Sequence, residues 1–246
     1  MGKIIAVVSG KGGTGKTSFT ANVGLSLAQL GKRVLCLDCD ITLRNLDLAL
    51  GLTDSALMDF SDVIQGRCPL DDAVVQHPRY PDLHLLTAPL SDAGTLDVTE
   101  RQMRKLLEQV KASYDFCLID SPAGLGQGFR LATACANCVV VITTPDASAL
   151  RDAQRTVMLL DRFGRDALYL VVARVQKKLL KALHYTIDDA MDTAGLPLLG
   201  VVPEDDDVSY ALNRGIPLRD MNYYAARAYE NIAKRITGQH VPLMRI

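Results

Sequence analysis

The first residues of this chain that could carry chemistry lie in a glycine-rich stretch, residues 10–17, which reads GKGGTGKT. It fits the phosphate-loop pattern G-x-x-x-x-G-K-[ST]. Glycines let the backbone turn its N–H groups inward as an anion cradle, and a helix that begins near Lys16 adds its positive end. Lys16 can reach the β- and γ-phosphates, and the Thr17 hydroxyl can ligate Mg²⁺. The pattern predicts a nucleotide site formed by Gly10, Lys11, Gly12, Gly13, Thr14, Gly15, Lys16, Thr17 and Ser18.

Lys11 is a second lysine in this loop, and the pattern does not require it. Lys16 already neutralises the phosphates from within the loop. An ammonium at the mouth of the loop could swing outward, and in two chains that met face to face each Lys11 could reach the nucleotide of the other. It would then act like an arginine finger supplied in trans, which stabilises charge as the γ-phosphoryl group leaves. The alternative is a solvated lysine beside the loop.

Three aspartates follow apolar runs that read as strands. Asp38 and Asp40 come at the end of RVLCLDCD, and Asp120 closes FCLID. Carboxyl ends of parallel strands meet at one edge of a sheet, where ligands collect. Three carboxylates at that edge need cations, and Mg²⁺ with its waters is the natural one. The alternative for each residue is a helix cap or a surface acid.

The elements that must position these residues alternate along the chain. Apolar runs rich in Val, Ile and Leu do not alternate with polar residues, as expected of strands buried on both faces. They cover residues 3–9, 33–38, 83–88, 115–120, 138–143, 167–173 and 198–202. Helical segments between them cover residues 16–30, 99–113, 147–163 and 186–194. The order predicts one α/β domain over residues 1–246, with a mainly parallel sheet flanked by helices on both faces.

The composition narrows the function classes. Hydrophobic residues make up 48% of the 246 residues, enough for a sizeable core. Lys and Arg total 27 against 28 for Asp and Glu, so the net charge gives no general case for nucleic acid. No apolar run approaches the ~18 residues needed to span a bilayer. We expect a cytoplasmic protein.

Six cysteines include two C-x-x-C pairs, Cys36/Cys39 and Cys135/Cys138. Such pairs can hold zinc or an iron–sulfur cluster. Cys36 and Cys39 lie in and just after a strand, where residues three apart point to opposite faces, so they do not easily share one ion. Buried thiols that behave as small hydrophobes are the favoured interpretation.

The stretch KGGTGKT resembles the deviant Walker A motif of the MinD/ParA class of P-loop ATPases, the SIMIBI type of P-loop NTPase. The similarity covers nearly the whole chain and is closest to the MinD branch, the septum site-determining ATPases of bacteria. LDCDITLRNLDLALGL resembles its switch I and FCLIDSPAG its Walker B and switch II. ITTPDASALRDAQR, LPLLGVVPED and NRGIPL follow in the expected order.

The resemblance implies roles for individual residues. The signature lysine, here Lys11, contacts nucleotide across an ATP-sandwich homodimer. Lys11, Lys16 and Asp40 are the implied catalytic residues, and Asp40 positions the attacking water. Thr17 ligates magnesium, and Asp38 and Asp120 hold the ion through water. The implied adenine pocket consists of Arg174, Pro203, Glu204 and Asp205.

Three positions depart from the family pattern. Ala173 stands where Asn is frequent, so one hydrogen bond to the base edge is missing. Thr42 replaces the usual switch I glycine, and Gly126 replaces a Glu near the expected dimer surface. These departures bear on base selectivity, partner contacts and hydrolysis rate.

The tail bears on membrane binding. MinD proteins usually end in a basic amphipathic helix that binds membrane, and no such helix is evident after residues 232–244. Residues 223–236 are amphipathic, but their apolar positions are expected to face the core. Residues 174–181, RVQKKLLK, form a short basic amphipathic segment that could touch an anionic surface. We expect weak or absent membrane binding.

The favoured function is an ATPase switch that dimerises on ATP, resets by Mg²⁺-dependent hydrolysis and places the division site. Its partners would be MinC-like and MinE-like proteins, and its location the cytoplasm or the inner face of the cell membrane. Alternatives are ParA-like DNA partition, which the near-neutral charge disfavours, and FlhG-like control of flagellar number. A non-hydrolysing ATP-binding scaffold and an iron–sulfur carrier of the same superfamily also stay open.

Overall fold

The strands form one sheet, which a computed structural model places in the order β3-β4-β2-β5-β1-β6-β7-β8. The structure describes residues 2–41, 44–89, 97–183, 186–221 and 223–244. Neighbouring strands are parallel, except that β3 runs antiparallel to β4. The bounds are β1 Lys3–Val8, β2 Val34–Asp38, β3 Val75–His77, β4 Tyr80–Leu86, β5 Phe116–Asp120, β6 Cys138–Thr143, β7 Leu168–Val175 and β8 Leu198–Pro203. Each of the seven predicted runs overlaps a strand, and β3 was not predicted.

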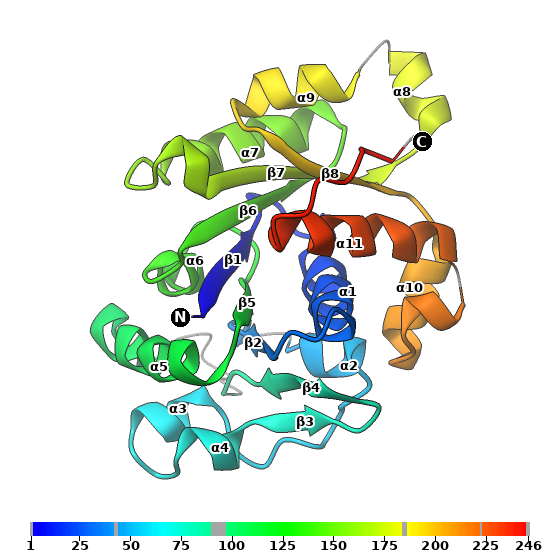
Figure 1. Cartoon of the computed structure of the whole chain (residues 1–246). Helices are drawn as coiled ribbons and strands as arrows, with labels where there is room; N and C mark the ends of the chain where they lie inside the picture. Colours follow the sequence, from blue (N-terminus) through cyan, green and yellow to red (C-terminus); the bar gives the residue numbers. More distant parts are fainter. Residues whose placement is uncertain (1, 42–43, 90–96, 184–185, 222, 245–246) are drawn as a thin grey trace.

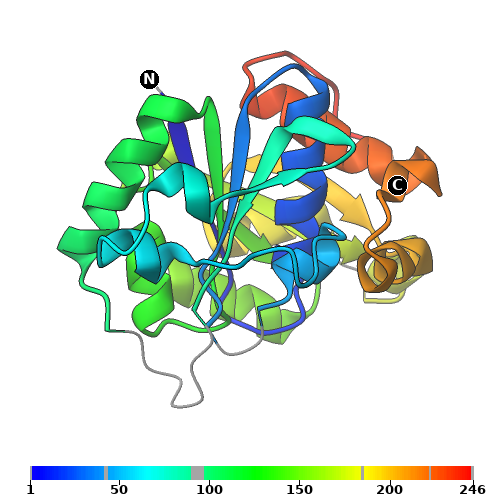
Figure 2. The same cartoon turned by 90° about the horizontal axis from the view of Figure 1, so that it is seen from below.

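Helices cover both faces of the sheet, as predicted (Figure 1). One face carries α1 Lys16–Gln29, α2 Leu46–Ala49, α10 Asp206–Arg214 and α11 Tyr223–Ile236. The other carries α3 Phe60–Ile64, α4 Leu70–Ala73, α5 Glu100–Ser113, α6 Gln127–Thr133, α7 Ala147–Met158, α8 Lys177–Leu183 and α9 Ile187–Ala194. Figure 2 shows this layering from below, with the blue helix α1 and the green helix α5 on opposite sides of the strands.

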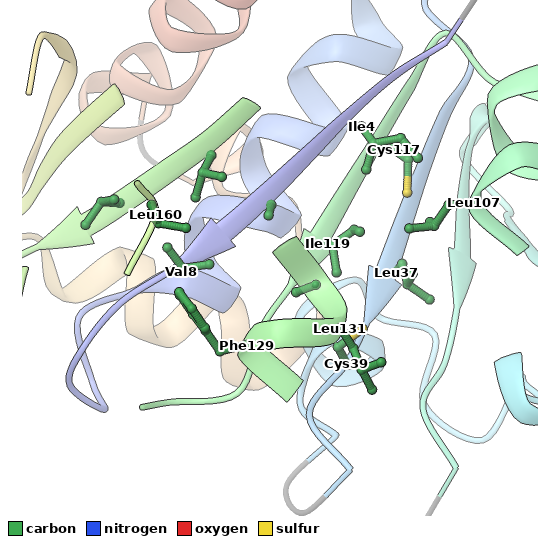
Figure 3. Packing of buried hydrophobic residues seen from close by; sticks show 14 of the residues in the cluster. Ile4, Val8, Leu37, Cys39, Leu107, Cys117, Ile119, Phe129, Leu131 and Leu160 are labelled. Atoms are coloured by element: carbon green, nitrogen blue, oxygen red, sulfur yellow. The ribbon is translucent and has the colours of Figure 1, made fainter. Parts of the chain in front are cut away.

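Two hydrophobic cores fill the spaces between the sheet and its helices. Along β1, Ile4, Ala6 and Val8 enter the core on the α5 side, and Ile5 and Val7 enter the core on the α1 side. Figure 3 shows the first core, where Ile4 of β1 lies beside Cys117 of β5, and Val8 of β1 lies toward Phe129 of α6. The continuous apolar runs are therefore strands buried on both faces.

The cysteines of the first C-x-x-C pair lie in different cores. Cys36 belongs to the core on the α1 side and Cys39 to the core on the α5 side. The prediction that they point to opposite faces is confirmed. Burial raises the pKa of both thiols well above the usual range, so both stay protonated in this fold.

The last helix turns its apolar face inward, as predicted. In α11, Ala225, Ala228, Tyr229 and Ile232 are buried against α1 and β8. The Arg235 guanidinium then donates to the carbonyls of residues 199, 241 and 242 at 2.8, 3.0 and 2.7 Å, which ties the following segment to this helix.

Residues 174–181 do not form one amphipathic segment, so that expectation was wrong. Arg174 and Val175 complete β7, and α8 starts only at Lys177. The strand continues because residue 175 pairs with Pro203 of β8. Among the described residues, no helix combines the length and apolar character needed to cross a bilayer.

Candidate nucleotide site

The phosphate loop joins the end of β1 to the start of α1. Two of its glycines adopt left-handed backbone angles, with φ of 75° at Gly13 and 98° at Gly15, the N-cap of α1. Gly10 is needed for another reason, because a Cβ there would lie 2.7 Å from the Asp152 carbonyl oxygen of α7. The loop is thus held between α1 and α7, and its glycines allow the tight turn.

Lys16 is 8% exposed and lies inside the loop. Its ammonium donates to Ser9 Oγ at 2.9 Å, and Ser9 Oγ donates to the Lys11 carbonyl at 2.7 Å. Burial lowers the pKa of Lys16, while the charges of Asp120 and Asp40 oppose that shift. Sequence reasoning missed Ser9, which precedes the motif; its only signal was a polar residue at the end of an apolar strand.

Thr17, Asp38 and Asp120 meet beside the loop. Thr17 Oγ1 donates to Asp120 Oδ2 at 2.6 Å, and Asp38 stands opposite Asp120 in the register of β2 and β5. Asp120 is 2% exposed. Burial raises its pKa to about 6, although the Thr17 hydrogen bond and the Lys16 charge act the other way. Burial and the neighbouring Asp120 likewise raise the pKa of Asp38. A nearby cation would stabilise the ionised form of these two buried acids.

The oxygen atoms at this place suit magnesium. Asp120 Oδ1 is buried and has no hydrogen-bond partner within the described part of the chain. Carboxylate and hydroxyl oxygens are the donors that Mg²⁺ prefers, and the ion usually keeps several waters and binds substrate phosphates. The described residues contain no group of three or more His, Cys, Asp or Glu side chains that could hold a metal ion by themselves. Thr17, Asp120 and Asp38 therefore fit a partly hydrated ion.

Asp38 also holds the loop that follows β2. Its Oδ1 accepts from the backbone N–H of Asp40 at 2.8 Å, and its Oδ2 accepts from that of Leu46 at 3.2 Å. These bonds fix both ends of the segment that carries the half-buried Asp40. The negative charge of Asp40 acts on the Lys16 ammonium and opposes the lowering of its pKa by burial. Thr42, the departure expected in this loop, lies outside the described residues.

The Lys11 side chain contacts the start of α7. Its ammonium donates to Ser148 Oγ at 3.1 Å and lies 3.7 Å from Asp146 Oδ1, with about half of the side chain exposed. Asp146 is the N-cap of α7. Burial would raise the pKa of Asp146, but hydrogen bonds from Thr144, Ser148 and the Ala149 amide lower it to about 2. Lys11 thus rests on an ionised carboxylate of its own chain.

The predicted base-binding residues lie at the ends of β7 and β8. Arg174 has a left-handed φ of 57° and donates to both Glu204 carboxylate oxygens at 2.8 and 2.9 Å. It also donates to the Gly13 carbonyl at 3.1 Å, which connects this pair to the phosphate loop. Pro203 ends β8, and Asp205 caps α10. An open groove of about 320 Å³ is lined by residues that include Lys11, Gly13, Thr14, Arg174 and Glu204.

The other positions singled out in the sequence lie close to this groove or at a nearby helix start. Ala173 is buried, and a Cβ added at Gly15 would lie 3.9 Å from the Cβ of Ala173. Ser18 is buried in the first turn of α1, and the exposed Gly126 is the N-cap of α6. The structure thus brings the phosphate loop, the three aspartates and the base-side residues to the carboxyl ends of the strands.

A mainly parallel sheet with a phosphate loop after β1 and carboxylates at the ends of β2 and β5 defines a P-loop nucleotide-binding domain. The family model described as AAA domain matches residues 2–168 of the chain. The chain is 41% identical over 246 residues to septum site-determining protein MinD of Bacillus subtilis (strain 168), covering 99% of this chain and 92% of that protein. It therefore belongs to the MinD family of P-loop ATPases, which confirms the resemblance drawn from its motifs.

Solved structures of MinD proteins match the fold of this chain. The MinC:MinD cell division protein complex of Aquifex aeolicus matches with a TM-score of 0.90 at 36% identity, covering 99% of this chain and 98% of that one. Septum site-determining protein MinD of Pyrococcus horikoshii, complexed with Mg-ADP, matches with a TM-score of 0.83 at 30% identity, covering 96% of each chain.

Proposed function

We propose that this chain is a Mg²⁺-dependent ATPase that dimerises on binding ATP and resets by hydrolysis, and that it acts in placing the division site. The observation that carries the chemistry is the contact of Thr17 with Asp120, whose second carboxylate oxygen is buried and unpartnered in the described chain. Membership of the MinD family supports the biological role, and it favours this role over DNA partition, flagellar-number control or iron–sulfur transfer.

In this proposal the loop and its neighbours divide the work. The backbone N–H groups of the loop and the Lys16 ammonium bind the phosphates. A magnesium ion bound by Thr17, Asp38 and Asp120 would neutralise phosphate charge. Asp40, held by the Asp38 carboxylate through its backbone N–H, would orient the attacking water. Arg174 and Glu204 would contact the base.

Lys11 is the residue that would link hydrolysis to dimerisation. In one chain its ammonium rests on Ser148 and Asp146, outside its own loop. A side chain that is half exposed and held by a surface ion pair worth about 0–1 kcal/mol can leave this position at little cost. In a face-to-face dimer it would reach the partner's phosphates and reduce the repulsion between two triphosphates.

We infer the partners and the location from membership of the family. The Aquifex aeolicus relative was solved in a complex named MinC:MinD, and we propose a MinC-like partner for this chain. A MinE-like activator is proposed from the resemblance alone. For the described residues we propose weak or absent membrane binding and a cytoplasmic location, with transient contact at the inner face of the cell membrane when a partner supplies a second attachment.

A subunit-mixing experiment tests this function. Lys11→Ala should bind ATP nearly as wild type but neither dimerise nor hydrolyse, and Asp40→Ala should dimerise without hydrolysis. In a mixed dimer, the intact Lys11 of the Asp40→Ala chain faces the nucleotide of the Lys11→Ala chain, which retains Asp40. One site is then complete, so phosphate release should return in the mixture.

The controls separate binding from chemistry. Lys16→Ala should lose nucleotide binding in calorimetry, because it removes a direct phosphate contact. An Asp40→Ala chain that stays monomeric with Mg-ATP in light scattering would contradict the proposed role of Asp40. Dimerisation of wild type without any phosphate release would favour the non-hydrolysing scaffold. Normal hydrolysis by Lys11→Ala alone would show that this lysine is only a solvated neighbour of the loop.

A further inference from the structure

Ser9 is the residue directly after β1, and its hydroxyl connects the two lysines of the phosphate loop. The residue is 0% exposed. The Lys16 ammonium donates to Ser9 Oγ at 2.9 Å, and Ser9 Oγ donates to the Lys11 carbonyl at 2.7 Å. A serine hydroxyl has one proton, so the direction of both bonds is fixed: the proton is given to Lys11, and a lone pair accepts from Lys16.

We propose that Ser9 is a positioning residue, whose hydroxyl holds the Lys16 ammonium at the phosphate-binding end of the loop and fixes the peptide that follows Lys11. The inference rests on the proposed nucleotide site and goes beyond it, because the phosphate-loop pattern begins at Gly10 and assigns no role to the position before it. Ser9 would act through Lys16 and through the backbone, with no contact to the substrate itself.

The physical argument concerns a long side chain with a buried charge. An ammonium that is removed from water needs acceptors, and hydrogen bonds to a charged group are shorter and stronger than neutral ones. Two bonds in a row also polarise each other. Without the hydroxyl, the nearby charges that attract Lys16 are the carboxylates of Asp120 and Asp40. Lys16 would then be drawn toward the groups proposed to serve magnesium and water, and the Lys11 carbonyl would lose its donor.

The test is the binding of ATP and of inorganic tripolyphosphate to Ser9→Ala in calorimetry. A hydrogen bond to a charged group is worth enough that its loss should weaken binding by about tenfold or more. If Ser9 acts through Lys16, the factor should be the same for both ligands, because both present phosphates and only ATP has a base. The KM for ATP should rise by a similar factor.

Matched variants separate positioning from general loosening of the fold. Ser26→Ala also removes the hydroxyl of a buried serine, one that donates to the Asn22 carbonyl near the far end of α1, and it should bind ATP as wild type. Ser9→Thr retains the hydroxyl and should recover most of the affinity. Ser9→Cys keeps the size with a weaker acceptor and should fall between serine and alanine, which serves if the threonine methyl disturbs the fold.

Three results would overturn the inference: unchanged ATP affinity in Ser9→Ala, an equal loss in Ser26→Ala, or a loss with ATP that tripolyphosphate does not share. Its failure is distinct from failure of the proposed function. If wild type binds ATP and Lys16→Ala does not, the nucleotide site stands whatever Ser9→Ala does. If wild type binds neither ligand, the nucleotide site itself is wrong.

Discussion

Thr14 is a residue of the phosphate loop with a buried hydroxyl. The residue is 2% exposed, and its Oγ1 has no hydrogen-bond partner among the described residues. An unsatisfied buried hydroxyl costs about 1–3 kcal/mol, because the group has lost its hydrogen bonds to water. The loop backbone at this position can contribute to the anion cradle whatever the side chain is, so the hydroxyl and the cradle can be separated by mutation.

Thr14→Val should therefore stabilise the nucleotide-free protein by about 1 kcal/mol, since it replaces the hydroxyl by a methyl of similar size. The measurement is urea unfolding without nucleotide and magnesium, and Thr14→Ser serves as a control that retains the hydroxyl. A valine variant less stable than wild type would mean that the hydroxyl is satisfied, for instance by a buried water.

At this scale the sequence predicted residues better than contacts. Lys16 and Thr17 were found because one contiguous motif contains them, and the aspartates because apolar runs end at them. The bond from Lys11 to Ser148 joins residues 137 positions apart, so no local pattern could indicate it. The role of Ser9 was missed for a related reason: its meaning depends on where the Lys16 side chain folds back, which spacing along the chain does not determine.

Among the helices, α2 and α10 meet through two glycines placed just after their ends. Gly51 and Gly215 have φ of 67° and 59°, and a Cβ on Gly51 would overlap the Gly215 carbonyl oxygen. The α2 helix follows the loop that carries Asp40, and α10 follows the base-side residues Glu204 and Asp205. The glycine contact therefore joins the two helices that follow the segments proposed to surround the nucleotide.

Gly51→Ala should destabilise the protein by at least about 2 kcal/mol, because it adds overpacking to the cost of a left-handed alanine. Gly66→Ala is the matched control: Gly66 has φ of 73° with open space around its Cβ position, so it should lose only about 1 kcal/mol. Chemical unfolding of both variants gives the difference. Equal losses would show that the two helices can move apart without cost.

Most of the long elements were predictable, and the shortest ones were not. The seven predicted strands and the helices α1, α5, α7 and α9 carry enough residues to display a buried or amphipathic pattern. The three-residue strand β3 and the four-residue helices α2 and α4 are too short to show a period. The predicted helix over residues 147–163 ends at Met158, because the chain turns there and returns Leu160 to the core.

At the scale of the whole molecule, buried titratable groups give the fold two opposing responses to pH. Burial lowers the pKa of His77 and His84, so their contribution to stability is present above about pH 6.5 and is lost as the pH falls. Asp120 behaves in the opposite way: its pKa is raised to about 6, so its contribution is present at low pH and is lost as the pH rises through that value. The pH dependence of the free energy of unfolding should combine both responses.

A histidine variant separates these responses. His84 lies on β4 between β2 and β3, and its ring meets that of Tyr114 edge-on at 5.3 Å. Burial is the main cause of its lowered pKa, the nearby Arg33 lowers it further, and Asp82 acts against them. In protein free of nucleotide and magnesium, the free energy of unfolding should therefore fall less between pH 7 and pH 5 in His84→Gln than in wild type.

The absolute stability of the variant will differ, so the comparison rests on the change with pH, measured by urea unfolding at both values. His240→Gln, at an exposed histidine, is the control and should follow wild type. The same change with pH in all three proteins would mean that His84 takes up its proton equally in the folded and unfolded chain, and the buried environment assigned to it would be wrong.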